Sequence, residues 1–189
     1  MIIALSTSSP VASVAILEDD GRVRRESSRV APQAASGACL AMLEALLDEP
    51  LSKATLILAD LGPGSFTGVR VGVTLAKVLA FMAGASCGGA SSFDLVNREG
   101  DVAIPSRRGE YFIRKPGHEP FRTTERPATT LVGFGPWFEE GEAVYPLAAR
   151  FSALVTSLTT LAPEELLPSY LMEPSISLPK SPFGRVVSG

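Results

Sequence analysis

Short apolar runs of strand length alternate with small polar turns in the first part of the chain. Residues 2–5 and 11–17 are apolar and flank a turn at residues 6–10, a pattern that predicts a β-hairpin. Residues 22–29 are mostly polar, which is typical of an edge strand, and residues 56–59 have the branched apolar character of a buried strand. The chain is therefore predicted to open with three antiparallel strands, and a further buried strand follows.

Two helices are predicted from the spacing of apolar residues. Residues 33–49 carry apolar side chains at i, i+3, i+4 and i+7, the spacing of one helix face. The second helix begins at a cap residue, either Ser65 or Thr67, and runs to about Ala83. Gly84 stands just past its end, where a glycine commonly terminates a helix.

The second helix is apolar or small on every side over residues 71–83, apart from Thr74 and Lys77. A helix that packs on a sheet needs only one apolar face, so this helix is expected to be covered on two sides. Its small residues recur at i, i+4, i+8 and i+11 and form a stripe that a second helix can approach closely. The stripe consists of Gly72, Ala76, Ala80 and Ala83.

Two coverings of this stripe are compatible with the sequence. It packs on the helix of residues 33–49 in the same chain or, as we prefer, it belongs to an interface in which both helices meet two helices of a partner. In the preferred arrangement, Ala76→Arg leaves a folded chain that no longer associates. The predicted partner-binding residues are Cys39, Leu40, Leu43, Leu47, Val69, Gly72, Val73, Ala76, Ala80 and Ala83.

From residue 101 the composition shifts to short, charged strands. Four strands are predicted, at residues 101–104, 109–114, 119–124 and 129–134, and they form a second, small sheet. Residues 87–92 are predicted as a connection, 93–97 as a short helix, 145–161 as a helix, and the part from Pro174 as an extended tail. The chain then divides into a first lobe, residues 1–99, and a smaller second lobe, residues 100–189.

A loop that contains three glycines joins the strand at 56–59 to the second helix. Free amides and the positive end of a helix meet at such a place and attract anions. The loop has neither the Lys-Ser/Thr pair of a Walker A loop nor the G-x-G-x-x-G spacing. It is either a nucleotide or phosphate loop or a tight turn without a ligand. Its residues are Gly62, Gly64, Ser65, Phe66, Thr67 and Gly68.

The segment from Gly62 to Arg70, GPGSFTGVR, followed by an apolar helix, resembles the signature of the bacterial TsaB (YeaZ) family. Residues 103–111 and 168–171 resemble two further segments of that family. The resemblance implies an α/β fold of the two-lobed actin-like, hexokinase-like kind (ASKHA, RNase H-like), here with a shortened second lobe. It extends over most of the chain and is tightest in the glycine loop.

The resemblance also implies a function. Members of this family are the non-catalytic partners of the kinase-like TsaD enzyme in making threonylcarbamoyladenosine in tRNA. The implied partners are a TsaD-like paralogue and a TsaE-like ATPase, with tRNA bound indirectly through the complex and a homodimer when the paralogue is absent. No cofactor is required, and weak ATP or ADP binding is expected in the partner or at the interface.

Two enzymatic alternatives remain. A phosphotransferase or ATPase would use loops at Ser6, Gly62 and Gly133, but Ser6 and Pro105 stand where the resemblance leads one to expect aspartates. Residues 131–135 are compatible with a ligand-approach turn and with a plain turn. A metallopeptidase is disfavoured because His118 is the one histidine, and no metal site is predicted.

Composition sets further limits. The chain has 189 residues, 46% hydrophobic and 20% charged, which indicates a globular protein, and a net charge of −3 disfavours a nucleic-acid clamp over the whole surface. The positive excess between residues 105 and 126 fits a solvated strand face better than an RNA contact. Cys39 and Cys87 are expected to be free thiols in the cytoplasm, and the uncharged stretch 78–93 is too short and glycine-rich to span a membrane.

Overall fold

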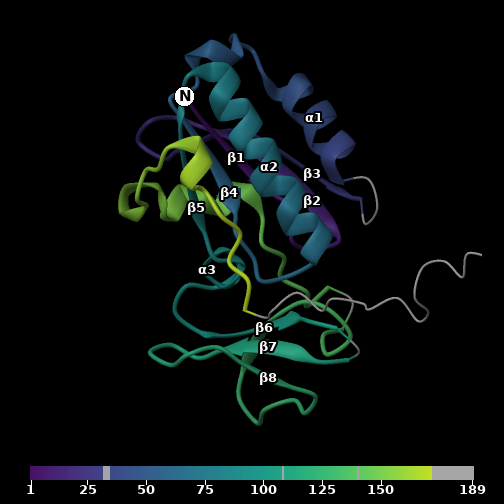
Figure 1. The fold of residues 1–189 in the computed structure, drawn as a ribbon. Helices are drawn as coiled ribbons and strands as arrows, with labels where there is room; N and C mark the ends of the chain where they lie inside the picture. The colour runs from purple at the N-terminus through teal and green to yellow at the C-terminus, as the bar shows by residue number, and fades with distance from the viewer. Residues whose placement is uncertain (32–34, 108, 140, 172–189) are drawn as a thin grey trace, which may run out of the picture.

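The computed structural model describes residues 1–31, 35–107, 109–139 and 141–171, and these form two sheets, one above the other in Figure 1. The first sheet has the strand order β3-β2-β1-β4-β5, in which β1 pairs antiparallel with β2 and parallel with β4. Its strands are β1 Ile2–Ser6, β2 Val11–Leu17, β3 Val23–Val30, β4 Leu56–Asp60 and β5 Ser86–Ala90. The mixed α/β architecture and the three antiparallel opening strands are as predicted.

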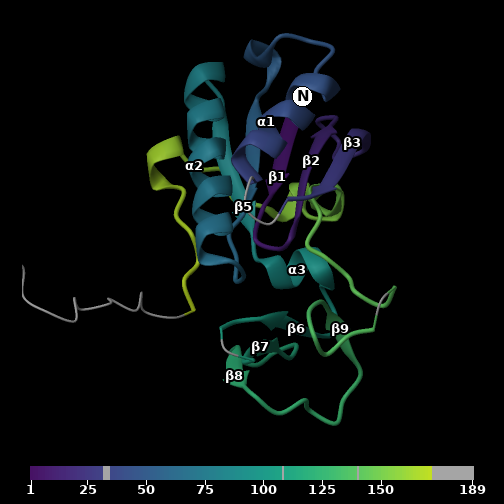
Figure 2. The same cartoon turned by 90° about the vertical axis from the view of Figure 1, so that its right-hand side faces the viewer.

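Helices α1 (Ala35–Leu46) and α2 (Phe66–Ala83) lie side by side on one face of this sheet, as Figures 1 and 2 show. Side chains alternate between the two faces along each strand. In β1, Ile3 and Leu5 therefore pack under the helices, whereas Ile2 and Ala4 face the opposite side. Residues before 35 that were predicted in the first helix lie outside the described residues.

The two ends of α2 follow directly from its sequence. Ser65 is the N-cap, and its hydroxyl accepts a hydrogen bond from the amide of Gly68 at 3.2 Å. Gly84 ends the helix with φ +67°, a left-handed conformation that glycine adopts without strain. By length and composition alone α2 would suffice to cross a membrane, but its buried residues pack on the sheet of this fold.

The second sheet has the order β8-β7-β6-β9, and the four predicted strands are all present, the last three in shorter form. Its strands are β6 Asp101–Pro105, β7 Tyr111–Arg114, β8 Phe121–Thr123 and β9 Leu131–Gly133. Helix α3 (Ser92–Val96), predicted at 93–97, lies between the two sheets in Figure 2. The Arg114 guanidinium donates to the carbonyls of Arg98, at 2.8 Å, and of Asn97, which ties β7 to the end of α3.

Two predicted elements are wrong. Residues 87–90 were predicted as part of a connection, but with Ser86 they form strand β5 parallel to β4. The strand is rich in small residues because its neighbours are close: a Cβ on Gly89 would lie 2.7 Å from the carbonyl oxygen of Ala59. A connection was predicted because small residues lack the branched apolar signature of a strand.

The helix predicted at residues 145–161 is instead a pair of short 3-10 helices, η2 (Ala148–Ala153) and η3 (Val155–Ser157). Serine and threonine are frequent in this stretch and compete with helical hydrogen bonding, so the apolar spacing did not produce an α-helix. Phe151 is fully buried and packs with Leu154 against the face of the first sheet opposite α1 and α2.

The boundary predicted at residue 100 separates the two sheets, but some residues after it pack against the first sheet. Side chains of η2 belong to the core of the first sheet, and so does Leu166, which follows the 3-10 helix η4 (Pro163–Glu165) and packs beside α2. The chain thus leaves the first sheet at α3, builds the second sheet and returns. Beyond residue 171, the predicted tail lies outside the described residues.

Candidate functional site

The outward side of α2 exposes large apolar side chains. Phe81 is 84% exposed, Met82 67% and Val78 49%, and these residues stand at i, i+3 and i+4 on one side of the helix. On the neighbouring helix α1, Leu40 is 48% exposed. We call these four residues, Leu40, Val78, Phe81 and Met82, the outer helix face.

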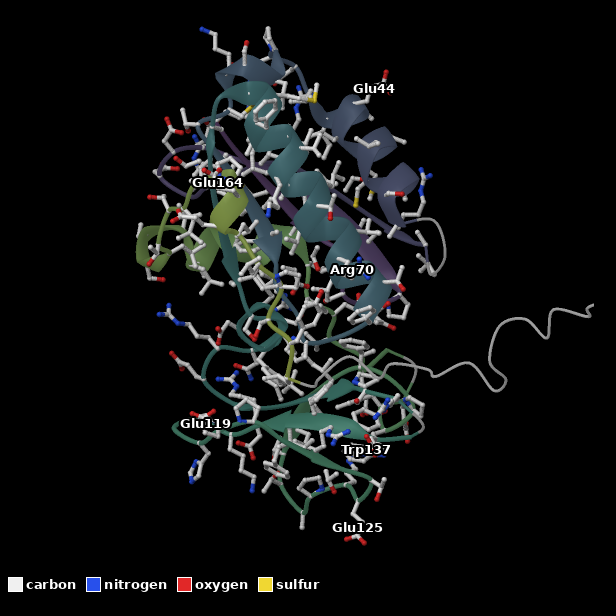
Figure 3. The ribbon with its side chains drawn as sticks, viewed as in Figure 1. Glu44, Arg70, Glu119, Glu125, Trp137 and Glu164 are labelled. Atoms are coloured by element: carbon white, nitrogen blue, oxygen red, sulfur yellow. The ribbon has the colours of Figure 1, made fainter. Side chains whose placement is uncertain are left out.

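A groove continues from this face toward the N-terminal ends of α1 and α2. It has a volume of about 450 Å³ and a mainly apolar lining. Arg70 contributes the charge, and Figure 3 shows it near the end of α2 closest to the second sheet. The lining residues are Ser36, Thr67, Arg70, Val71, Thr74, Leu75 and Val78.

The small-residue stripe does not take part in this exposed surface, contrary to prediction. Ala76 and Ala80 are 0% exposed, and Gly72 is buried so closely that a Cβ on it would lie 2.4 Å from the Thr7 hydroxyl oxygen. The stripe lets α2 approach the sheet and the β1–β2 turn, so the preferred prediction, that these residues face a partner, is wrong for them. Ala76 and Ala80 belong to a buried core cluster of the same chain that also contains residues of α1. We call Gly72, Ala76 and Ala80 the inner stripe.

The remaining predicted partner-binding residues divide in the same way. Buried residues in the core under the helices are Cys39, Leu43, Val69 and Val73. Leu40 is exposed, and Leu47 and Ala83 are partly buried at the edge of that core. Of the predicted set, Leu40 alone lies on the outer helix face.

The glycine loop is filled by the chain itself. The Ser65 amide donates to the Ser8 carbonyl at 2.7 Å, and the Thr7 hydroxyl donates to the Gly68 carbonyl at 2.7 Å. A Cβ on Gly68 would lie 2.0 Å from the carbonyl oxygen of Thr7, and one on Gly64 would lie 2.2 Å from that of Ser8. The glycines therefore allow the β1–β2 turn to lie directly against the loop, where a phosphate would otherwise approach.

The rest of the predicted loop set has separate roles. The Gly62 amide donates to Asp60 Oδ1 at 2.9 Å, and its carbonyl accepts from the Ser92 amide at 2.7 Å. Phe66 is exposed and its ring lies 5.4 Å from that of Tyr170. Thr67 is exposed and lines the groove.

Asp60, at the end of β4, is the centre of a buried polar cluster. Its carboxylate oxygens lie within hydrogen-bond distance of the hydroxyls of Ser6 (2.7 Å), Ser8 (2.5 Å) and Ser92 (2.5 Å). Asp60 itself is 1% exposed. Burial raises the pKa of its carboxyl, while the hydrogen bonds from Ser8, Ser92, the Gly62 amide and Ser6 act in the opposite direction.

Other candidates occupy structural positions. At the end of β9, a Cβ on Gly133 would lie 1.9 Å from the carbonyl oxygen of Ala103, so this glycine serves close strand packing. His118 lies in an exposed turn with Nδ1 3.0 Å from the Pro116 carbonyl oxygen. Within the described ranges, no three His, Cys, Asp or Glu side chains gather as a metal site would require.

Most described basic residues of the second lobe also have partners within the chain. Arg122 pairs with Glu110 at 3.1 Å, and Arg126 donates to the Trp137 carbonyl at 2.6 Å. The Trp137 and Tyr111 rings are stacked 3.7 Å apart, and Figure 3 shows Trp137 on the second sheet. Arg108 lies outside the described residues.

Known proteins match this chain in two ways. Residues 26–101 match the family model described as TsaD, tRNA N6-adenosine threonylcarbamoyltransferase. A Pseudomonas aeruginosa protein described as uncharacterized and similar to peptidase YEAZ matches in structure with a TM-score of 0.76 and 24% identity, over 90% of this chain and 99% of that one. The fold is that of the YeaZ proteins.

A second structure, YeaZ from Pseudomonas aeruginosa, matches with a TM-score of 0.70 and 23% identity over the same shares of both chains. No curated protein matches the sequence. The predicted resemblance to the YeaZ proteins is thereby confirmed at the level of the fold, as is the predicted α/β class.

Sequence reasoning missed two parts of this region. Asp60 directly precedes the glycine loop in the sequence, but no pattern connects Ser8 and Ser92 with it. The three come from separate segments, and their contact exists through the fold. The exposed side of α2 was detectable, because Val78 and Met82 are large apolar residues outside the stripe. The error was to assign the stripe to the outside.

Proposed function

We propose that this chain is a non-catalytic subunit of a tRNA N6-threonylcarbamoyladenosine transferase complex. Its outer helix face binds a TsaD-like catalytic paralogue, and in the absence of that paralogue the same face pairs with a second copy of the chain. tRNA and a TsaE-like ATPase meet the chain through the complex, which operates in the cytoplasm. Weak ATP or ADP binding, where it occurs, belongs to the partner or the interface.

The exposure of Phe81 carries this proposal. A phenylalanine that is 84% exposed beside an exposed Met82 is unfavourable in water, and such side chains are frequent at protein interfaces. Two helices and a groove form a surface onto which two helices of a relative with the same fold can pack. The match to the TsaD family model supports a paralogue as that relative.

The packing of the glycine loop supports the non-catalytic assignment over a phosphotransferase or ATPase. Phosphoryl transfer needs a positioned divalent cation and groups that contact the phosphates. At the corresponding place, Ser8 and Thr7 occupy the approach to the loop, and the Ser6 hydroxyl oxygen lies 2.7 Å from Asp60 Oδ2. The isolated protein is expected to hydrolyse ATP no faster than the buffer background.

Phe81→Arg tests the proposal. It places a charge on the outer helix face without touching the core, so the chain is expected to keep its unfolding free energy within about 0.5 kcal/mol. Binding to the TsaD-like paralogue of the same organism, and self-association, are expected to weaken by about tenfold or more. Sedimentation velocity of the chain alone and mixed with the paralogue measures both.

Phe121→Arg is the matched control, because Phe121 is also an exposed phenylalanine but lies on β8 of the second sheet. It is expected to leave both associations unchanged. If wild type binds neither the paralogue nor itself, or if Phe81→Arg binds as wild type does, the proposed interface is wrong. Loss of tRNA modification in a reconstituted system with Phe81→Arg but not Phe121→Arg would connect the interface with the reaction.

A further inference from the structure

The contacts around Asp60 contain more short oxygen–oxygen distances than the serine hydroxyls have hydrogens. Ser6 Oγ lies 2.5 Å from the Pro146 carbonyl oxygen and 2.7 Å from Asp60 Oδ2. A carbonyl oxygen only accepts, so the single hydrogen of the Ser6 hydroxyl is directed to Pro146. The contact between Ser6 and Asp60 then needs a hydrogen from elsewhere.

The other two hydroxyls cannot supply it. The Ser8 hydrogen lies in the 2.5 Å contact with Asp60 Oδ2, and the Ser92 hydrogen lies in the 2.5 Å contact with Oδ1. The longest contact, 3.0 Å between Ser92 and Ser8, is the one left without a hydrogen. An ionised Asp60 leaves Ser6 Oγ facing Oδ2 with no hydrogen between them, whereas a proton on Oδ2 satisfies all four shorter contacts.

We infer that Asp60 is a neutral acid in the folded protein and that its proton, donated from Oδ2 to Ser6 Oγ, completes a pH-sensitive joint between the two lobes. All four side chains of the cluster are at most 1% exposed, so an ionised carboxylate there is costly. The direction of the pKa shift, upward through burial, agrees with the hydrogen count.

We call the cluster a joint because it contacts both segments that connect the two sheets, the outgoing one at Ser92 and the returning one at Pro146. Ser92 begins α3, which leads out to β6, and Pro146 precedes η2, which returns to the first sheet. Next to Pro146, the Ala148 amide donates to the Ser13 hydroxyl at 2.8 Å. Ionisation of Asp60 would remove the hydrogen bond to Ser6 and weaken the contacts of the cluster with both connecting segments. This inference goes beyond the proposed function and does not depend on it.

Charged groups on the surrounding elements are engaged elsewhere. On α3, Asp94 lies 3.9 Å from Arg114, and in η2, Arg150 donates to the Val96 carbonyl. On α2, Arg70 lies over the Phe66 ring, and Lys77 donates to the carbonyls of Glu164 and Leu166. The β1–β2 turn from Ser6 to Pro10 and the strand β5 carry no ionisable side chain apart from Cys87, whose thiol contacts the Ala76 carbonyl.

The test compares the pH dependence of unfolding of wild type and Asp60→Asn, which places an N–H donor where Oδ2 carries its proton. Because folding raises the pKa, stability from this group is complete below the unfolded pKa of about 3.9 and is lost as pH rises through the folded pKa. Relative to the variant, the wild-type unfolding equilibrium constant is expected to rise up to tenfold per pH unit between these values. Urea denaturation from about pH 5 to pH 8 measures it.

Asp94→Asn, at an exposed aspartate, is the control and is expected to show no such slope. Parallel profiles for wild type and Asp60→Asn, or a wild type that gains stability over the variant as pH rises, would overturn the inference. Should Asp60→Asn fail to fold, the ¹³Cγ resonance of Asp60 in labelled wild type decides. The chemical shift of a protonated acid at pH 7 supports the inference, and that of a carboxylate overturns it.

Discussion

The two sides of α2 are both apolar, yet they have opposite environments. The inner stripe consists of small residues and lies against the sheet and the β1–β2 turn, with Ala76 fully buried. The outer helix face consists of large residues and leaves Phe81 84% exposed. Small residues here indicate close packing within the chain, and large exposed residues indicate a surface that another molecule covers. Residue size, rather than polarity, distinguishes the two sides.

The largest loss of stability is expected when an arginine, the side chain introduced by Phe81→Arg on the outer helix face, is placed on the inner stripe instead. Ala76→Arg buries a guanidinium without a counter-charge in a core that has no space for it, at a cost of several kcal/mol, about 3 to 5. The variant is therefore expected to be unfolded or molten, in contrast to Phe81→Arg. Circular dichroism and a thermal melt of the two variants measure the difference. A cooperatively folded Ala76→Arg chain would show that the inner stripe is not core.

A smaller difference in stability is expected between alanine substitutions at two helical glycines, Gly68 and Gly37. A Cβ on Gly68 in α2 would lie 2.0 Å from the Thr7 carbonyl oxygen, whereas a Cβ on Gly37 in α1 meets nothing within 4 Å. Gly68→Ala is expected to destabilise the protein by about 1 to 3 kcal/mol because the β1–β2 turn must shift. Gly37→Ala is expected to stabilise it by about 0.5 to 1 kcal/mol through helix propensity. Urea denaturation compares them, and equal effects would contradict the close contact between the loop and the turn.

The smallest effect concerns the thiol on the inner side of α1. Burial raises the pKa of Cys39 from 9.0 to about 11, so at pH 8 about one thiol in a thousand is ionised. Since the thiolate is the reactive form, iodoacetamide at pH 8 is expected to leave Cys39 unmodified in the native protein and to label it in urea. Mass spectrometry of the modified peptides measures both. Rapid native labelling would mean that α1 opens away from the sheet.

Much of the first lobe could be predicted from its sequence, because local signals and packing agree there. Ser65 and Gly84 mark both ends of α2, and the apolar runs mark β1, β2 and β4. Strand β5 was missed because its glycines are required by neighbours that are distant in sequence, such as Ala59. The helix expected at 145–161 failed because spacing alone does not outweigh a run of serine and threonine.

The candidate site was less predictable for a physical reason. An apolar stripe shows that something covers a helix but does not show from which molecule the cover comes. For Ala76 and Ala80 it comes from the core of the same chain. The Asp60 cluster depends on Ser8, Ser92 and Pro146, which topology brings together from three separate segments. A pattern within one stretch of sequence does not reveal contacts between residues that are so far apart along the chain.

The return of η2 to the first sheet determines when that sheet can be finished during synthesis. A nascent chain that ends before residue 148 already contains all five strands of the first sheet but lacks Phe151 and Leu154. The side of the sheet formed by Ile2 and Leu58 then stays open to water, and exposed apolar surface of this kind favours aggregation and chaperone binding. This face of the first sheet can therefore be covered only after the second sheet has been synthesised, because η2 follows that sheet in the sequence.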